Sequence, residues 1–121
     1  MSGAAVWPTT IDYKKAERVL HVAFEDGAMF ELPAEYLRVE SPSAEVQGHG
    51  AKTKITVAGK KNVAIVKIEQ IGNYAVRLVF DDGHDTGLYS WDYLHKLGRD
   101  RIKLWFEYES RLKAANLSRE A

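Results

Sequence analysis

The chain contains no cysteine. This excludes disulfide bonds, thiolate nucleophiles, cysteine-bound iron–sulfur clusters and every cysteine-based zinc site. The sequence also lacks an apolar run near the roughly 20 residues that span a bilayer. Its N-terminal residues 1–8 lack the basic and apolar regions of a signal peptide. We therefore expect a cytoplasmic protein that does not contact a membrane.

An excess of charge of either sign is missing as well. Seventeen Lys and Arg residues balance seventeen Asp and Glu residues, so the chain has no overall attraction for phosphate backbones, and nucleic acid is not expected as a partner. What remains is an ordinary globular composition, 45% hydrophobic over 121 residues. That length predicts one domain over residues 1–121 with a core of its own.

Residues 74–94 contain a strand, a tight turn, a second strand and a helix start in direct succession. Apolar residues alternate along the first strand, at Val76, Leu78 and Phe80. Asp82-Gly83 then supplies a dipeptide that tolerates the positive φ of a type I′ hairpin turn. Ser90 is placed to cap a helix that begins at Trp91. The segment therefore predicts a β-hairpin followed by a helix.

The first third of the chain has the same pattern. After a short strand over 11–15, apolar residues alternate at Leu20, Val22 and Phe24. Asp26-Gly27 gives the turn, and Pro33 fits the first turn of a short helix over 34–37. The likeness predicts an internal two-fold repeat. The fold class is α+β: a mainly antiparallel sheet from two similar hairpin-helix units (core about 7–98) plus a C-terminal helix over about 99–116.

The segments between these patterns are less regular. Residues 40–50 are rich in turn formers and predict a surface loop. Strands are expected over 54–57 and 63–71, the second of which would join the later hairpin in a three-stranded meander. Gly98 is expected to end the helix that Ser90 begins.

The C-terminal helix has a wide apolar face. Its apolar stripe contains Ile102, Trp105, Phe106 and Leu112, and is widened by Leu104, Tyr108 and Ala115. This is about half of the circumference, more than the ~100° that a helix needs to dock on a core. Two interpretations follow: the helix lies in a groove of the sheet, or part of its face serves self-association or a protein partner.

Five segments in order resemble the gamma-butyrobetaine hydroxylase-like N-terminal domain family. They are Pro8-Thr9-Thr10-Ile11, Leu32 to Arg38, Ser41 to Val46, Ile71 to Val76 and Asp81 to Leu94. In the hydroxylases this module precedes an iron- and 2-oxoglutarate-dependent catalytic domain, and related modules are joined to nucleotide-binding iron–sulfur carrier proteins. The resemblance implies a stand-alone bacterial-type member that lacks the oxygenase chemistry.

Zinc-binding members of this family hold Zn²⁺ with three cysteines from a Cys-x-Cys-x-x-Cys loop and one histidine. The matching positions here are Ser41, Ser43, Val46 and His84. A serine hydroxyl is not deprotonated at neutral pH and valine has no lone pair, so we do not expect zinc at these positions. The family geometry still implies that the loop meets His84, which would hydrogen-bond Ser41 or Ser43.

An alternative keeps a metal near the same place. His84 with His49 and Glu45 offers imidazole and carboxylate ligands, which suit Fe²⁺ or Zn²⁺. His21 and His95 are expected at the surface. No Gly-x-Ser-x-Gly nucleophile elbow is present, and we expect neither catalysis nor a cofactor beyond such a metal.

The leading functional expectation is a non-catalytic accessory or protein-interaction module. By family analogy, its unidentified partner would be an iron–sulfur carrier or an oxidoreductase, which links the protein to iron–sulfur or redox-cofactor metabolism. Self-association into a homo-oligomer stays open. The partner surface is expected to include His49, Trp91 and Tyr108 beside the loop. The competing hypothesis is a metal-binding protein that uses His84 with His49 and Glu45.

Overall fold

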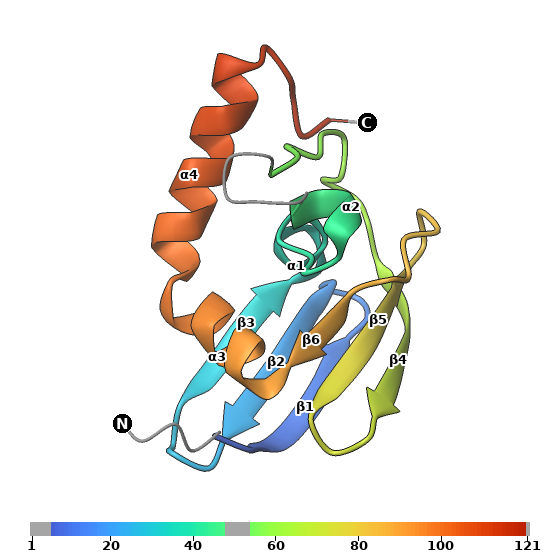
Figure 1. The fold of residues 1–121 in the computed structure, drawn as a ribbon, viewed down its shortest axis with the longest axis vertical. Coiled ribbons are helices and arrows are strands. Elements are labelled where there is room, and N and C mark those ends of the chain that lie inside the picture. The colour runs from blue at the N-terminus through green and yellow to red at the C-terminus, as the bar shows by residue number, and fades with distance from the viewer. Residues whose placement is uncertain (1–5, 48–53, 121) are drawn as a thin grey trace.

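Two three-stranded antiparallel sheets form the framework of the protein (Figure 1). This computed structural model describes residues 6–47 and 54–120. The first sheet has the order β1-β2-β3, with β1 (Pro8–Lys14), β2 (Val19–Phe24) and β3 (Met29–Pro33). The second has the order β4-β5-β6, with β4 (Ile65–Ile71), β5 (Ala75–Phe80) and β6 (Leu88–Ser90). The α+β class with mainly antiparallel pairing is confirmed.

Each sheet is followed directly by a helix, which confirms the two similar units. Helix α1 (Ala34–Val39) follows β3, and α3 (Trp91–Arg99) follows β6. Both hairpin turns contain a glycine in the left-handed region, Gly27 with φ 90° and Gly83 with φ 91°. This conformation strains residues with a Cβ, so it explains the glycines. The predicted type I′ turn is wrong, because that turn needs positive φ at both central residues and neither Asp26 nor Asp82 has it.

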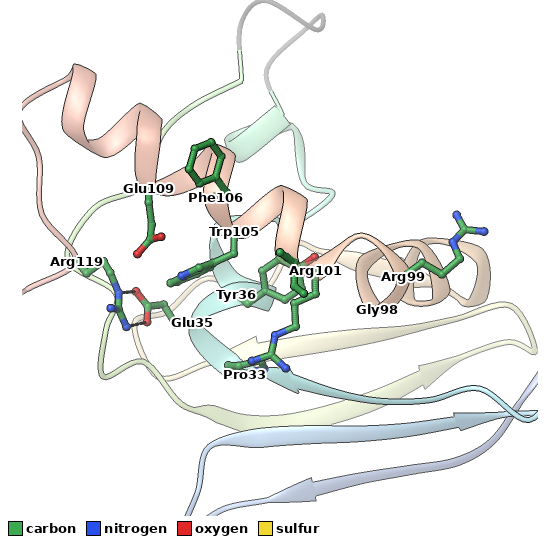
Figure 2. Close-up of a pocket in the computed structure, with 11 residues that line it drawn as sticks. Pro33, Glu35, Tyr36, Gly98, Arg99, Arg101, Trp105, Phe106, Glu109 and Arg119 are labelled. Carbon is green, nitrogen blue, oxygen red and sulfur yellow. Dashed lines mark hydrogen bonds and ion pairs between the residues drawn. The ribbon is translucent and has the colours of Figure 1, made fainter.

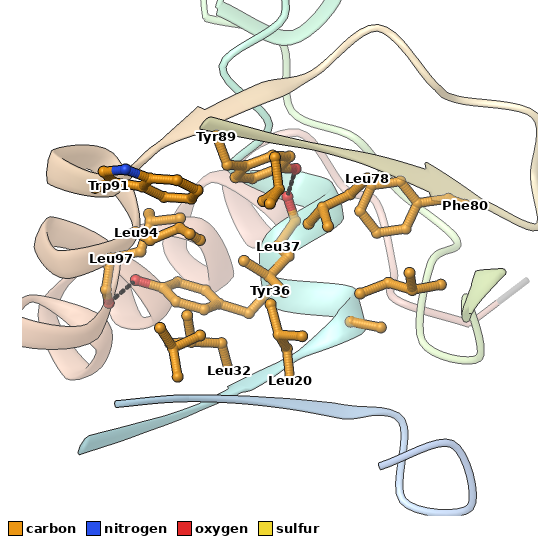
Figure 3. Close-up of a cluster of buried hydrophobic side chains, with 14 of the residues drawn as sticks. Leu20, Leu32, Tyr36, Leu37, Leu78, Phe80, Tyr89, Trp91, Leu94 and Leu97 are labelled. Carbon is orange, nitrogen blue, oxygen red and sulfur yellow. Dashed lines mark hydrogen bonds between the residues drawn. The ribbon is translucent and has the colours of Figure 1, made fainter. Parts of the chain in front are cut away.

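The hydrophobic core lies between the two sheets and against α1 and α3 (Figure 3). The alternating residues predicted from both hairpins are all buried: Leu20, Val22, Phe24, Val76, Leu78 and Phe80. Two buried tyrosines tie helices into this core through their hydroxyl groups. Tyr36 donates to the Leu97 carbonyl at 2.7 Å, and Tyr89 donates to the Leu37 carbonyl at 2.5 Å.

Helix α3 begins as predicted but does not end at Gly98. The Ser90 hydroxyl accepts a hydrogen bond from the Tyr93 backbone N–H at 3.2 Å, which confirms the cap. The helix continues through Gly98 to Arg99. A Cβ at Gly98 would lie 2.2 Å from Cγ of Phe30. The glycine is therefore explained by close packing on the first sheet rather than by helix termination.

The strand expected over residues 54–57 is wrong, because this segment bonds to helices instead of a sheet. The Ile55 N–H donates to the carbonyl of Val46, in the short helix α2 (Ala44–Gln47), at 2.6 Å. The Val57 carbonyl accepts a hydrogen bond from the Tyr108 hydroxyl at 2.6 Å. The first strand of the second meander begins only at Ile65.

Helix α4 (Arg101–Ala114) does not lie in a groove of a sheet. It stands beside α1 and extends beyond the strands (Figure 1). Its inner residues Tyr108 and Leu112 pack with Val39 of α1 in a separate apolar cluster. In contrast, Ile102 and Phe106 are 88% and 70% exposed. Only one side of the wide apolar face is therefore buried within the protein, and the other side is exposed.

Among residues 6–47 and 54–120, no helix is both long and apolar enough to cross a membrane.

Candidate functional site

His84 lies just after the second Asp-Gly turn and points into the molecule. Its backbone N–H donates to Asp82 Oδ1 at 3.0 Å, an interaction that fixes the turn. Its side chain is only 3% exposed, and its ring lies 6.1 Å from that of Phe80, centroid to centroid. The turn therefore holds the imidazole against the core and leaves its two nitrogens facing the segment after α1.

That segment provides a hydrogen-bond partner for each ring nitrogen. Ser41 Oγ lies 2.9 Å from Nε2 of His84, and Glu45 Oε1 lies 3.0 Å from Nδ1. Ser43 Oγ lies 2.8 Å from Thr86 Oγ1, which also donates to Glu45 Oε1 at 3.2 Å. We call Ser41, Ser43, Glu45, His84 and Thr86 the His84 cluster. It joins the 41–45 segment to the second hairpin through side chains.

The surroundings of the His84 imidazole favour its neutral form over its charged form. Burial lowers the pKa of His84, and the nearby Arg38 guanidinium lowers it further, while Glu45 and Asp82 partly offset both effects. In the neutral form, one tautomer satisfies both contacts: Nδ1–H donates to Glu45 and Nε2 accepts from the Ser41 hydroxyl.

A network of ion pairs closes the side of the cluster next to the turn. The Asp82 carboxylate accepts from Arg38 Nε at 2.8 Å and lies 2.7 Å from Lys60 Nζ. Burial alone would raise the pKa of Asp82. The hydrogen bonds from Lys60, the His84 N–H and Arg38 outweigh that effect and hold the pKa well below its ordinary value. The turn carboxylate therefore stays charged and keeps α1 attached to the second hairpin.

The order Ser41–His84–Glu45 is that of a serine hydrolase triad, but a substrate cannot reach the serine. Ser41 is fully buried, with an exposed fraction of 0%. Gly87 covers it so closely that a Cβ there would lie 2.6 Å from Ser41 Oγ. The Ser41 hydroxyl also accepts the Ser43 backbone N–H at 3.2 Å. A nucleophile needs an open approach to a carbonyl carbon, and this geometry provides none.

The residues present do not fit the zinc site of the family. The hydroxyls of Ser41 and Ser43 are already hydrogen-bonded inside the protein, and Val46 is buried at 1% exposure. Within the described part of the chain, no group of three His, Asp or Glu residues is arranged to hold a metal. Of the alternative ligand set, Glu45 and His84 meet, whereas His49 lies outside the described residues.

Two residues expected on the partner surface are buried. Trp91 is 6% exposed and donates its indole N–H to the Asn73 carbonyl at 2.8 Å. Tyr108 is 0% exposed. Both act in the fold, because each places its ring in a core and its polar atom on a backbone carbonyl. Neither ring is exposed in this structure, so their contact with a partner stays a prediction, and His49 lies outside the described residues.

His95 also differs from a simple surface residue. Its side chain is 13% exposed and its Nε2 lies 2.8 Å from Asp26 Oδ2. Its ring contacts Phe24 and Phe30, with centroids 4.8 and 5.4 Å away. His95 therefore fastens α3 to the first Asp-Gly turn.

An open groove of about 770 Å³ lies between α1, the α3–α4 junction and α4 (Figure 2). Tyr36 and Trp105 line it, and the exposed Ile102 and Phe106 stand on its α4 side. A volume of this size is within the range of binding pockets. The sequence indicated the apolar α4 residues, but it did not indicate the groove beside them.

The far end of the groove is closed by an ion pair that the sequence analysis missed. The Arg119 guanidinium donates to both carboxylate oxygens of Glu35, each at 2.7 Å, and lies 5.2 Å from the Trp105 ring centroid (Figure 2). The C-terminal tail is held there because Gly59 N–H donates to the Ser118 carbonyl at 2.9 Å. The tail has no apolar pattern to signal this contact.

Comparison with known proteins identifies the family. The family model described as gamma-butyrobetaine hydroxylase-like, N-terminal, matches residues 11–95. Two proteins solved by NMR in solution are 44% and 49% identical, each with a TM-score of 0.84; the alignments cover 97% and 98% of this chain, and 92% and 89% of those chains. A crystal structure of a DUF971-family protein of unknown function from Acidithiobacillus ferrooxidans is 40% identical, with a TM-score of 0.64. That match covers 75% of this chain and 91% of the other.

No match was found among curated protein sequences. Because the family model covers more than half of the chain and the two NMR structures match nearly all of it, the chain belongs to the gamma-butyrobetaine hydroxylase-like N-terminal domain family.

Proposed function

We propose that this protein is a non-catalytic accessory module that acts by binding another polypeptide at the groove beside α4. The observation that carries the proposal is the exposure of Ile102 and Phe106, at 88% and 70%, next to a groove of about 770 Å³. Large apolar side chains that stand together on a surface are typical of interaction sites. The inner side of the same helix is already packed, so the fold itself does not require these two residues.

The His84 cluster supports a binding role over an enzymatic one. Its serine is buried, burial lowers the pKa of its histidine, and its polar side chains bond to one another. Such a cluster stabilises a loop without offering a reactive group to a substrate. In this proposal it replaces the family's zinc as the connection between the 41–45 segment and the second hairpin.

The class of partner is proposed from the family alone. Related modules are joined to nucleotide-binding iron–sulfur carrier proteins, and in the hydroxylases the module precedes an oxidoreductase domain. An iron–sulfur carrier or an oxidoreductase is accordingly the partner to examine first. Function within such a family resides in particular surfaces rather than in the fold, so the surface needs its own test.

The test is site-specific photo-crosslinking in cells of the native host. A photoreactive amino acid replaces Phe106 in one variant and the exposed Glu17, in the turn between β1 and β2, in a control variant. We expect a discrete crosslinked product from position 106 and none from position 17, identified by mass spectrometry. Equal products from both positions, or none from either, would show that the α4 groove is not a binding surface.

A second candidate function is metal binding, and one contact favours it. His84 Nδ1 and the 64% exposed side chain of Glu45 already lie 3.0 Å apart, as two ligands of one ion could. Metal analysis of the purified protein and of the His84→Ala variant tests it. Stoichiometric iron or zinc that disappears in the variant supports this function, and equal metal content in both proteins contradicts it.

A further inference from the structure

The outer face of α4 has no partner within the described chain. We define this face as Ile102, Lys103, Phe106, Glu107, Glu109 and Ser110, all of which are exposed. The opposite side of the helix supplies the buried Tyr108 and Leu112. Trp105 is half-buried between the two sides and contacts the Tyr36 ring edge-on, with centroids 6.2 Å apart. The helix therefore presents a second apolar stripe, centred one turn before its middle.

Charges on α4 are separated along the helix. Its first turn carries Arg101 and Lys103, its centre carries Glu107 and Glu109, and its last turn carries Arg111 and Lys113. Within the described residues, Lys103, Glu107 and Glu109 form no ion pair. A second copy of α4 that runs antiparallel about an axis in the first half of the helix would place the positive first turn of each copy against the acidic centre of the other. A parallel copy would place like charges together, which is unfavourable.

We propose, building on the proposed function, that the partner of this face is a second copy of the chain, docked with the two α4 helices antiparallel about a two-fold axis. The apolar pair Ile102 and Phe106 is centred at position 104. The cations at 101 and 103 and the acids at 107 and 109 are centred together at position 105. One axis near this turn therefore brings Ile102 against Phe106 of the partner subunit and Lys103 toward the partner's Glu107.

The physical reasons for self-docking are consistent with one another. A two-fold interface uses the same patch twice, so the patch has to be complementary to itself, and the apolar pair Ile102 and Phe106 beside the opposite charges of Lys103 and Glu107 meets this condition. The chain has no net charge, so two copies do not repel each other at long range. Docking would cover Phe106, whose aromatic ring is the type of side chain that contributes most to interfaces.

The contact is expected to be weak. A helix of 14 residues is about 21 Å long, and one antiparallel helix pair buries less than a standard interface of about 1,600 Å². We therefore expect association on the order of tens of micromolar. Sedimentation equilibrium of the full chain, from about 1 μM to about 1 mM, should show a reversible monomer–dimer equilibrium.

Three variants separate this dimer from non-specific association. Phe106→Glu should weaken it about tenfold or more, whereas Met29→Glu, at a side chain 78% exposed on β3, should leave it unchanged. Lys103→Glu should weaken it about tenfold by placing an acid opposite Glu107 of the partner subunit. The double variant Lys103→Glu with Glu107→Lys should return it to within about twofold of the original. Circular dichroism checks that each variant is folded.

The results distinguish this inference from the proposed function. A chain that is monomeric throughout, or a dimer that Phe106→Glu does not weaken, overturns the self-docking inference. If the double variant does not regain the dimer affinity that Lys103→Glu loses, the antiparallel arrangement is wrong. If the chain is monomeric but position 106 crosslinks to a different polypeptide, the binding function stands and its partner is another protein. If the chain is monomeric and position 106 forms no crosslink, both the self-docking inference and the proposed binding function are wrong.

Discussion

Ser41 and His84 are 43 positions apart in the sequence, yet Ser41 Oγ lies 2.9 Å from His84 Nε2 in a buried hydrogen bond. The family resemblance implies that both residues occupy positions where zinc-binding members hold a metal between the loop and the hairpin. Here hydrogen bonds among Ser41, His84, Glu45, Ser43 and Thr86 make this connection without a metal.

Removing the imidazole should destabilise the protein. In His84→Ala, the partners of both ring nitrogens lose a hydrogen bond, and a space opens beside Phe80. We expect the free energy of unfolding to fall by about 2–3 kcal/mol, measured by urea denaturation. The matched control is His21→Ala on β2, which should change it by less than about 0.5 kcal/mol. Equal losses in both variants would contradict the structural role of the cluster.

Mild acid should destabilise the protein over the pH range in which His84 takes up a proton on unfolding. The pKa of His84 is lowered in the folded state, mainly by burial, so the unfolded chain binds the proton more readily. Stability therefore falls as the pH drops below the ordinary value near 6.5, by at most about 1.4 kcal/mol per pH unit for one proton. His84→Gln should flatten this part of the curve. If the melting temperature of the original protein does not change from pH 7.5 to 5.5, the predicted effect of His84 on the pH dependence is wrong.

Asp82 should affect stability over a separate, more acidic pH range. Hydrogen bonds outweigh its burial and hold its pKa below the ordinary 3.8, so its contribution is present above pH 4 and is lost as the pH falls below it. Asp82→Asn should reduce the loss of stability below pH 4. It should leave the His84-dependent change near pH 6 in place.

Zinc binding should arise when cysteines are introduced at the three positions that the family resemblance indicates. The triple variant Ser41→Cys, Ser43→Cys, Val46→Cys places thiolates at the positions that face His84 in zinc-binding relatives. We expect one Zn²⁺ per chain by elemental analysis, and a rise in melting temperature that a chelator removes. The same triple variant with His84→Ala should bind zinc at least tenfold more weakly. A triple variant that takes up no zinc would show that the loop is not positioned as in those relatives.

Much of this region followed from local sequence. The Asp-Gly turns, the alternating residues before them and the Ser90 cap depend on interactions between neighbouring residues, so a single sequence can indicate them. The approach of the 41–45 segment to His84 came from the family resemblance. Contacts between distant segments were missed where no local pattern marks them. Trp91 and Tyr108 look like candidate surface aromatics in sequence, but their exposure is decided by which segments pack over them.

The ion pair between Glu35 and Arg119 is one such distant contact, and it should hold the C-terminal tail. Glu35 is 7% exposed, so Arg119→Ala would leave a buried carboxylate without its main partner. Because the Arg119 side chain is 36% exposed, we expect a loss of only about 1–2 kcal/mol. Lys61→Ala, which breaks the exposed pair with Glu120, is the control and should cost less than about 0.5 kcal/mol. Limited proteolysis should cut the tail faster in Arg119→Ala alone.

Gly98 gives the clearest contrast between helix propensity and packing. Alanine in place of glycine inside a helix normally stabilises a protein by up to about 1 kcal/mol. At Gly98 the new Cβ would lie 2.2 Å from Cγ of Phe30, in the contact between α3 and the first sheet. We therefore expect Gly98→Ala to destabilise the protein by about 1–3 kcal/mol. The double variant with Phe30→Ala should lose less than the sum of the two single changes, and a stabilising Gly98→Ala would mean that α3 does not pack this closely.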